Sequence, residues 1–190
     1  MNERHETREA RLREQCEVVA SLITVMRPVY ESASPRQRAL LETILGAAIW
    51  YIPKPVRAWT GQISRGALQA FHPDSGNGRP RLSEEHVYPR KVAARLLLSD
   101  MSLTGESMTN QFREKYGRVH FVTSEENKAV QRHQRVGVFT SPDAAYALAG
   151  IAFVEFSDAE LRKVKKRDRE TIEQFLNSGL QRAEQSKTAV

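Results

Sequence analysis

A pair of acidic residues beside a histidine is the part of this sequence best suited to chemistry. Glu84, Glu85 and His86 stand together in the stretch 82–89, and a proline follows three positions after the histidine. A neutral imidazole, whose unperturbed pKa is about 6.5, can take a proton from an attacking water molecule. Carboxylate and amide oxygens suit a hard divalent cation that offsets negative charge near a leaving oxygen. These residue types together favour hydrolysis of a phosphodiester.

Two later segments supply further parts of the same pattern. Residues 118–123, RVHFVT, alternate β-branched and aromatic residues with polar ones, which predicts a strand. Thr123 followed by Glu125 and Glu126 is typical of a helix start, and this helix carries Asn127. An acid–histidine strand, a second strand and a helix with Asn resemble the HNH (His-Me finger, ββα-metal) endonuclease family. The resemblance covers residues 82–130, about a quarter of the chain.

The resemblance implies a metal-dependent nuclease. His86 would be the general base, and Glu85 and Asn127 would hold a divalent metal ion, Mg²⁺ in the usual case and Mn²⁺ as the alternative. Neighbouring residues on a regular strand face opposite sides, so Glu84 replaces Glu85 as the ligand on the His86 side if this strand is regular. Where the family often has an Asn on or before the second strand, this chain has Arg118 and His120.

The charge of the chain agrees with a polyanionic partner. The formal net charge is +6 and the sequence pI is about 9.7, although a solubilising surface accounts for this excess as well. Basic residues also lie near the two strands, which points to nucleic acid, DNA rather than RNA. The residues expected to contact it are Arg81, Arg90, Lys91, Arg118, His120, Lys128 and Arg132.

Several classes of protein are disfavoured. Cys16 is the single cysteine, so no intramolecular disulfide and no tetrahedral thiolate zinc site can form, and its apolar neighbours predict a buried thiol. The charged N-terminus lacks the apolar region of a signal peptide, and no apolar run approaches the ~18 residues of a membrane span. We therefore expect a cytoplasmic protein with no membrane partner.

The elements that must position these residues follow from apolar spacing and turn residues. A long first helix should kink or end at Pro28, Ser34-Pro35 should start a second helix, and 61–71 reads as a short helix. The chain from Ser157 onward reads as one helix. The expected fold is α+β and predominantly helical. In it a small β-sheet plus helix, a ββα-metal-like core with a helical insertion, packs among flanking helices. We expect a helical region at 1–78, the core at 79–156 and a basic helix at 157–190, in one compact domain.

Two other functions fit the same sequence. A non-catalytic nucleic-acid-binding module accounts for the charge and for the departures from the HNH pattern. A helical interaction protein, including a homodimer through the terminal helices, accounts for their apolar stripes, as does ordinary core packing. Metal-dependent cleavage separates the nuclease from the binding module, and salt-sensitive DNA binding separates the module from the interaction protein.

Overall fold

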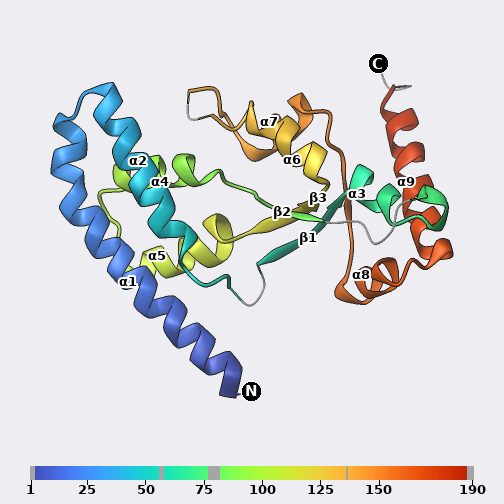
Figure 1. Cartoon of the computed structure of the whole chain (residues 1–190), viewed down its shortest axis with the longest axis horizontal. Helices are drawn as coiled ribbons and strands as arrows, with labels where there is room; N and C mark the ends of the chain where they lie inside the picture. The colour runs from blue at the N-terminus through green and yellow to red at the C-terminus, as the bar shows by residue number, and fades with distance from the viewer. Residues whose placement is uncertain (1–2, 56–57, 77–81, 136, 188–190) are drawn as a thin grey trace. The chain divides into compact units, whose positions relative to one another are not determined.

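The computed structural model describes residues 3–55, 58–76, 82–135 and 137–187, and these form two compact units (Figure 1). The first unit comprises Met1–Ala58, His86–Val119 and Gln134–Pro142. The second comprises Trp59–Glu85, His120–His133 and Asp143–Val190. Both units are assembled from segments that alternate along the chain, and the division at residues 79 and 157 stays a prediction.

The first unit is built from helices. α1 (Glu3–Ser32) and α2 (Pro35–Trp50) form a helical hairpin, which is blue in Figure 1. α1 packs against α5 (Gly105–Gln111), and α2 packs against α4 (Arg90–Ser99). A π-helical turn, η2 (Phe112–Tyr116), extends α5. The helical insertion expected between the two strands is therefore present as α4 and α5, the second with this change of helix type.

The sequence signal at Ser34 predicted the start of a helix correctly, whereas the signal at Pro28 did not predict where α1 ends. Ser34 caps α2, because its side chain accepts a hydrogen bond from the backbone of Gln37 and Pro35 occupies the first helical position. Of the two outcomes expected at Pro28, a kink or an end of the helix, the end is wrong, since α1 continues to Ser32. Met26 before the proline and Tyr30 after it both pack on the core, so tertiary packing outweighs the lost backbone hydrogen bond.

The core of the first unit lies between the α1–α2 hairpin and the α4–α5 pair. Cys16 is fully buried there, as predicted, and burial raises the pKa of its thiol to about 11. The main apolar members are Leu12, Val19, Ile23, Met26, Leu45, Ile49, Ile52, Leu97, Leu98, Met108 and Phe112.

The second unit is organised on a four-stranded sheet formed by described residues. Its strands are β1 (Trp59–Ser64), β2 (Ser83–His86), β3 (Val119–Val122) and β4 (Phe153–Glu155), in the spatial order β2-β3-β1-β4. β1 and β4 run antiparallel, with Ile63 opposite Val154. The expected acid–histidine strand and the expected strand at 118–123 are both present, as β2 and β3, and they are neighbours in the sheet. The chain is α+β and predominantly helical, as expected.

The prediction of a helix over 61–71 is wrong for its first half. Residues up to Ser64 belong to β1, and only α3 (Arg65–Ala70) is helical. Gly61 has φ +90°, a left-handed backbone conformation that a right-handed helix does not contain. Its carbonyl accepts a hydrogen bond from the backbone of Phe156, so pairing with the end of β4 decides the conformation.

Helices cover both faces of this sheet. One face packs Ile63 and Val154 against α3, α8 (Asp158–Lys165) and α9 (Arg169–Lys187). The other face meets α6 (Ser124–Gln131), whose Glu126 hydrogen-bonds Ser64 of β1. It also meets α7 (Pro142–Leu148), whose Tyr146 packs on Phe153 of β4. A short turn, η1 (Pro73–Ser75), follows α3.

The expectation of one helix from Ser157 onward is also wrong. α8 and α9 are separated at Arg167, whose φ is +62°. The guanidinium of Arg167 donates hydrogen bonds to the carbonyl oxygens of Phe71, His72 and Pro73, and Asp168 then accepts one from the backbone of Thr171 at the start of α9. Contacts with a distant segment therefore stabilise a conformation that an arginine rarely adopts.

Candidate active site

His86 is the last residue of β2, and one of its two ring nitrogens makes no hydrogen bond to any described residue. The backbone carbonyl of Tyr116 accepts a hydrogen bond from the imidazole. The other nitrogen, Nδ1, is buried and has no hydrogen-bond partner among the described residues, so the bond to Tyr116 is made by Nε2. This arrangement places the proton on Nε2 in the neutral ring and leaves the Nδ1 lone pair free to accept a proton.

The surroundings of His86 in the first unit keep the ring neutral. Its pKa is lowered to about 4, first by burial and then by the positive charges of Arg90 and Lys54. The ring packs against Trp50 at a centroid distance of 5.3 Å, and the Arg90 guanidinium lies 3.7 Å from the centre of the Trp50 ring. A histidine flanked by two cations suits a negatively charged ligand, because an anion would be attracted to both.

Arg118 supplies a second buried polar atom without a partner in the described part of the first unit. The backbone N–H of Val87, directly after His86, donates to the carbonyl oxygen of Arg118, so these two segments are neighbours. The Nε of Arg118 is buried and makes no hydrogen bond to any described residue. Buried polar groups are normally paired, so the two unpaired atoms, His86 Nδ1 and Arg118 Nε, are unusual among the described residues.

In the second unit, a hydrogen bond joins α6 to β2, the two elements that carry the residues expected to hold a metal. The side chain of Asn127 donates a hydrogen bond of 2.6 Å to the hydroxyl of Ser83. Ser83 and Glu85 are two positions apart on β2 and therefore share a face of the strand. Glu85 is buried on that face, whereas Glu84 is exposed. Of the two acids considered from the sequence, Glu85 is the one on the Asn127 side.

These residues suit a magnesium ion better than a metal held only by protein. Among the described residues there is no group of three or more His, Cys, Asp or Glu side chains placed to hold a metal. Magnesium is commonly bound by one or two carboxylates, with waters and substrate phosphates completing its shell. One carboxylate from Glu85 and one amide oxygen from Asn127 would suit a magnesium ion whose other ligands are water molecules and substrate phosphates.

His120 does not lie on the surface, as its expected contact with nucleic acid required. It is only 7% exposed, and its Nδ1 lies 2.6 Å from the hydroxyl oxygen of Thr60. Its ring packs against Tyr146 and Phe153, at centroid distances of 5.3 and 4.5 Å. The alternation along β3 was read correctly, but α7 covers the face assumed to meet solvent, so His120 is corrected to an interior residue.

The hydroxyl of Tyr146 marks a polar spot on the same face of the sheet. Burial raises the pKa of Tyr146 far above its usual range, and the charge of Glu85 adds to this effect. The hydroxyl is buried and has no hydrogen-bond partner among the described residues. Tyr146 is a core residue that is 3% exposed, and nothing in the sequence indicated that the charge of Glu85 would act on it.

The remaining basic residues have different surroundings. Arg90, Lys91, Lys128 and Arg132 are exposed, as a phosphate contact requires, and Arg118 is half-buried. The Nε of Arg132 lies 3.0 Å from the Nε2 of His133. Arg81 falls outside the described residues.

Sequence reasoning missed the residues that surround His86. Trp50 and Lys54 lie more than thirty positions before it, and no local pattern connects them to it. The contribution of Tyr116 comes from its backbone carbonyl, which every residue type offers. Only packing of the first unit brings these groups to the imidazole.

Comparisons of the chain with protein-family models, with curated proteins and with solved structures gave no match. Among the described helices, none has the length and apolar character needed to cross a membrane.

Proposed function

We propose that this protein is a metal-dependent nuclease that hydrolyses phosphodiester bonds, with DNA as the preferred substrate. The observation that carries the proposal is the state of His86. Its Nε2 is occupied by a backbone carbonyl, its Nδ1 is free, and its depressed pKa keeps the ring neutral at pH 7. A general base needs an unprotonated nitrogen without a competing partner, and this residue has one.

The chain's own residues divide the work. His86 Nδ1 takes the proton of the attacking water molecule, and the Nε2 bond to Tyr116 fixes the ring and stabilises the imidazolium that forms. Arg90 and Lys54 attract the phosphate in the first unit. The free Nε of Arg118 can donate a hydrogen bond to a phosphate oxygen.

Glu85 and Asn127 are the proposed ligands of the metal ion. When bound, a divalent cation supplies positive charge that stabilises the phosphate and the leaving oxygen. Asn127 is fixed to β2 through Ser83, on the face of the strand that carries Glu85, whereas His86 lies on the opposite face with Glu84. Neither the HNH resemblance nor the choice of Mg²⁺ is needed to explain the His86 environment, so the metal has to be tested separately from the base.

The test of the base is plasmid nicking by the wild type and by His86→Ala, with Mg²⁺ or Mn²⁺ and with a chelator. Loss of a general base lowers the rate by about a hundred- to ten-thousand-fold, whereas DNA binding should be nearly unchanged, because dispersed cations supply it. His133→Ala is the matched control, as this half-buried histidine of the second unit has its ring nitrogen Nε2 3.0 Å from the Nε of Arg132. Wild-type cleavage by a folded His86→Ala protein would exclude the mechanism.

The proposed metal ligands are tested by substitution, with the adjacent residue Glu84 as the comparison for Glu85. Glu85→Ala and Asn127→Ala should lose cleavage at low metal concentration and regain part of it with excess Mg²⁺ or Mn²⁺. Glu84→Ala should cleave like the wild type if Glu85 holds the metal, and should lose cleavage at low metal concentration if the ligand lies on the His86 face of β2, which Glu84 shares. Metal rescue of Glu84→Ala and not of Glu85→Ala would reverse the assignment. A wild type inactive with every divalent metal would leave a non-catalytic nucleic-acid-binding module.

A further inference from the structure

We propose that the outer face of the α1–α2 hairpin binds a second copy of this chain, so that two hairpins pack face to face. This face carries large apolar side chains that are between 37% and 78% exposed. They are Val18, Leu22, Val25 and Val29 on α1, and Leu40, Ile44 and Tyr51 on or directly after α2. Single exposed apolar residues are ordinary, but Val18, Leu22 and Tyr51 line one groove, and apolar side chains gathered in this way indicate an interaction surface.

The same face is nearly free of charge. Residues 18–29 and 39–51 contain one arginine and one glutamate, in a chain in which 27% of residues are charged. Both point into the first unit. Arg27 is 8% exposed and donates to the carbonyl of Leu98, and Glu42 is 2% exposed and pairs with Arg95. Every exposed residue of these two segments is therefore uncharged, and loss of charged residues distinguishes the centre of an interface from ordinary surface.

The spacing of the apolar residues suits helix–helix packing. On α1 the buried row Cys16, Val19, Ile23, Met26 advances in steps of three and four residues and packs against the rest of the first unit. The exposed row Val18, Leu22, Val25, Val29 repeats this spacing one position earlier, on the adjoining side of the helix. The same spacing of three and four residues recurs in and directly after α2, at Leu40, Ile44, Ala47 and Tyr51. Rows with this spacing interdigitate in antiparallel four-helix arrangements.

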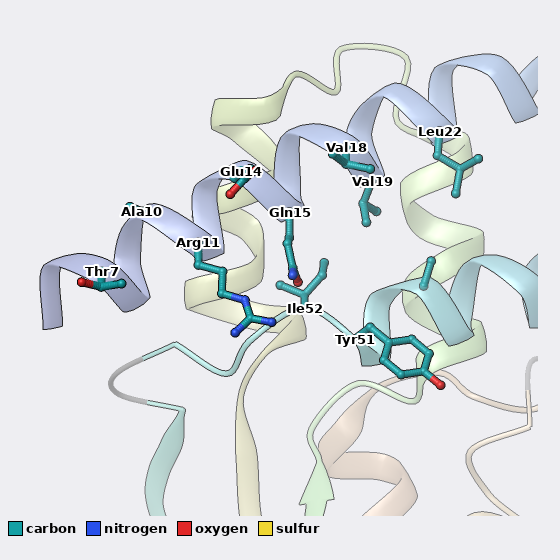
Figure 2. Close-up of a pocket in the computed structure, with 11 residues that line it drawn as sticks. Thr7, Ala10, Arg11, Glu14, Gln15, Val18, Val19, Leu22, Tyr51 and Ile52 are labelled. Carbon is teal, nitrogen blue, oxygen red and sulfur yellow. The ribbon is translucent and has the colours of Figure 1, made fainter. Parts of the chain in front are cut away.

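A groove lies within this face, between α1 and the end of α2. Figure 2 shows Val18, Val19 and Leu22 projecting from α1 toward Tyr51 and Ile52. The groove has a volume of about 670 Å³, and Arg11 and Glu14 line the end of it nearest the N-terminus. A side chain from an opposing surface could enter this groove and bury the apolar groups that line it.

A second copy is the occupant that these features favour. The partner surface must be uncharged and must carry apolar residues at helical spacing, and the hairpin itself meets both conditions. A two-fold axis through the face would pair each hairpin with its identical partner, which is how most homodimers form. The seven exposed side chains offer several hundred Å², a large part of the roughly 800 Å² that each partner contributes to a standard interface.

The test is sedimentation equilibrium of the full chain between about 1 and 100 µM, the range in which modest dimers dissociate. The wild type should be dimeric at the upper end. Val25→Lys should raise the dimer dissociation constant at least tenfold, because it places a charge at the centre of the interface. Val138→Lys is the matched control, since Val138 is a similarly exposed valine (58% against 73%) outside the hairpin. Circular dichroism verifies folding, and Ile44→Lys replaces Val25→Lys if the latter unfolds.

A wild type that is monomeric at about 100 µM overturns the proposal. A dimer that both valine variants weaken equally, or that neither weakens, overturns it as well, because the contact would then lie elsewhere. Binding of a monomeric wild type to lipid vesicles, lost in Val25→Lys, would assign the face to a membrane surface instead.

Discussion

The positive charges of Arg90 and Lys54 make the pKa of His86 sensitive to an anion bound beside them. Both cations disfavour a proton on the imidazole, and burial disfavours it more strongly. A phosphate beside them would neutralise part of this effect and raise the pKa of His86 toward its ordinary value. The imidazole would therefore be neutral in the free protein and would become a stronger base if the proposed phosphate substrate bound beside it. This order suits catalysis better than a permanently basic histidine, which would already be protonated.

The depressed pKa of His86 also predicts how stability changes with pH. The folded value is about 4 and the model value for a free histidine is 6.5, so between these pH values the unfolded chain binds a proton that the folded chain does not. The free energy of unfolding therefore falls as pH falls from 6.5 to 4 and is unaffected by His86 above 6.5. The shift corresponds to about 3 kcal/mol at full extent.

Urea unfolding of the wild type and of His86→Gln at pH 7 and pH 4.5 measures this contribution. Glutamine cannot bind the proton, so the variant should lose less stability between the two pH values. His133→Gln serves as the control and should keep the wild-type acid sensitivity. Equal losses in the wild type and in His86→Gln would show that the imidazole does not titrate as the structure implies.

Two elements of the second unit are joined by one carboxylate. Thr123 and Glu126 form a capping box at the start of α6, in which Glu126 accepts a 2.8 Å hydrogen bond from the backbone of Thr123. The same carboxylate accepts a 2.5 Å hydrogen bond from the hydroxyl of Ser64, whose side chain caps α3. The start of α6, which positions Asn127, is thus tied to the end of β1.

Gly61 tests the pairing of β1 with the chain that follows β4. Gly61→Ala should lower the free energy of unfolding by about 1–2 kcal/mol, because alanine is strained in the left-handed conformation. Its Cβ would also lie 3.2 Å from the carbonyl oxygen of Phe156. Gly137→Ala is the matched control, with ordinary φ and no atom within 4 Å of the new Cβ. Chemical denaturation of both variants provides the comparison, and a Gly61→Ala protein as stable as the control would contradict the argument.

The elements that the sequence predicted are those whose signals are local. Ser34-Pro35 at α2 and Thr123 with Glu126 at α6 identify helix starts through side chains next to the backbone groups that they cap. The helix break at Arg167 depends on carbonyl groups some ninety-five positions earlier, so no short window could reveal it. β1 was missed for the same reason, because its conformation depends on pairing with β4.

In the candidate site too, the sequence indicated the residues that belong to local patterns but not those brought close by packing. The acid–histidine pair and Asn127 were selected from their types and order, and their role stays a prediction, since the contact of Asn127 with β2 is its hydrogen bond to Ser83. Burial reversed the interpretation of His120, since the alternation of β3 identifies its face but not the helix that covers it. The cations and the carbonyl around His86 follow from packing, which no motif records.

Charge is distributed unevenly over the chain as a whole. The formal net charge is +6, yet residues 18–29 and 39–51 contribute no exposed charge. The exposed cations therefore belong to other segments, including Arg90 and Lys91 in the first unit and Lys128 and Arg132 in the second. An uncharged surface for a second copy and basic surfaces for a polyanion would let one molecule use both partners at once.

Binding to DNA should weaken steeply with salt, because each phosphate neutralised by a lysine or arginine releases counterions. Fluorescence anisotropy with a labelled duplex between about 50 and 200 mM salt gives the slope of the logarithm of affinity. The double variant Lys128→Ala/Arg132→Ala should reduce that slope by about 1 for each phosphate contact removed. Lys163→Ala/Lys166→Ala is the control, because these exposed cations at and after the end of α8 share their segment with Glu160 and Asp168. The control should keep the wild-type slope. Affinity that is absent at low salt, or indifferent to salt, would remove the polyanionic partner and with it the substrate proposed for His86.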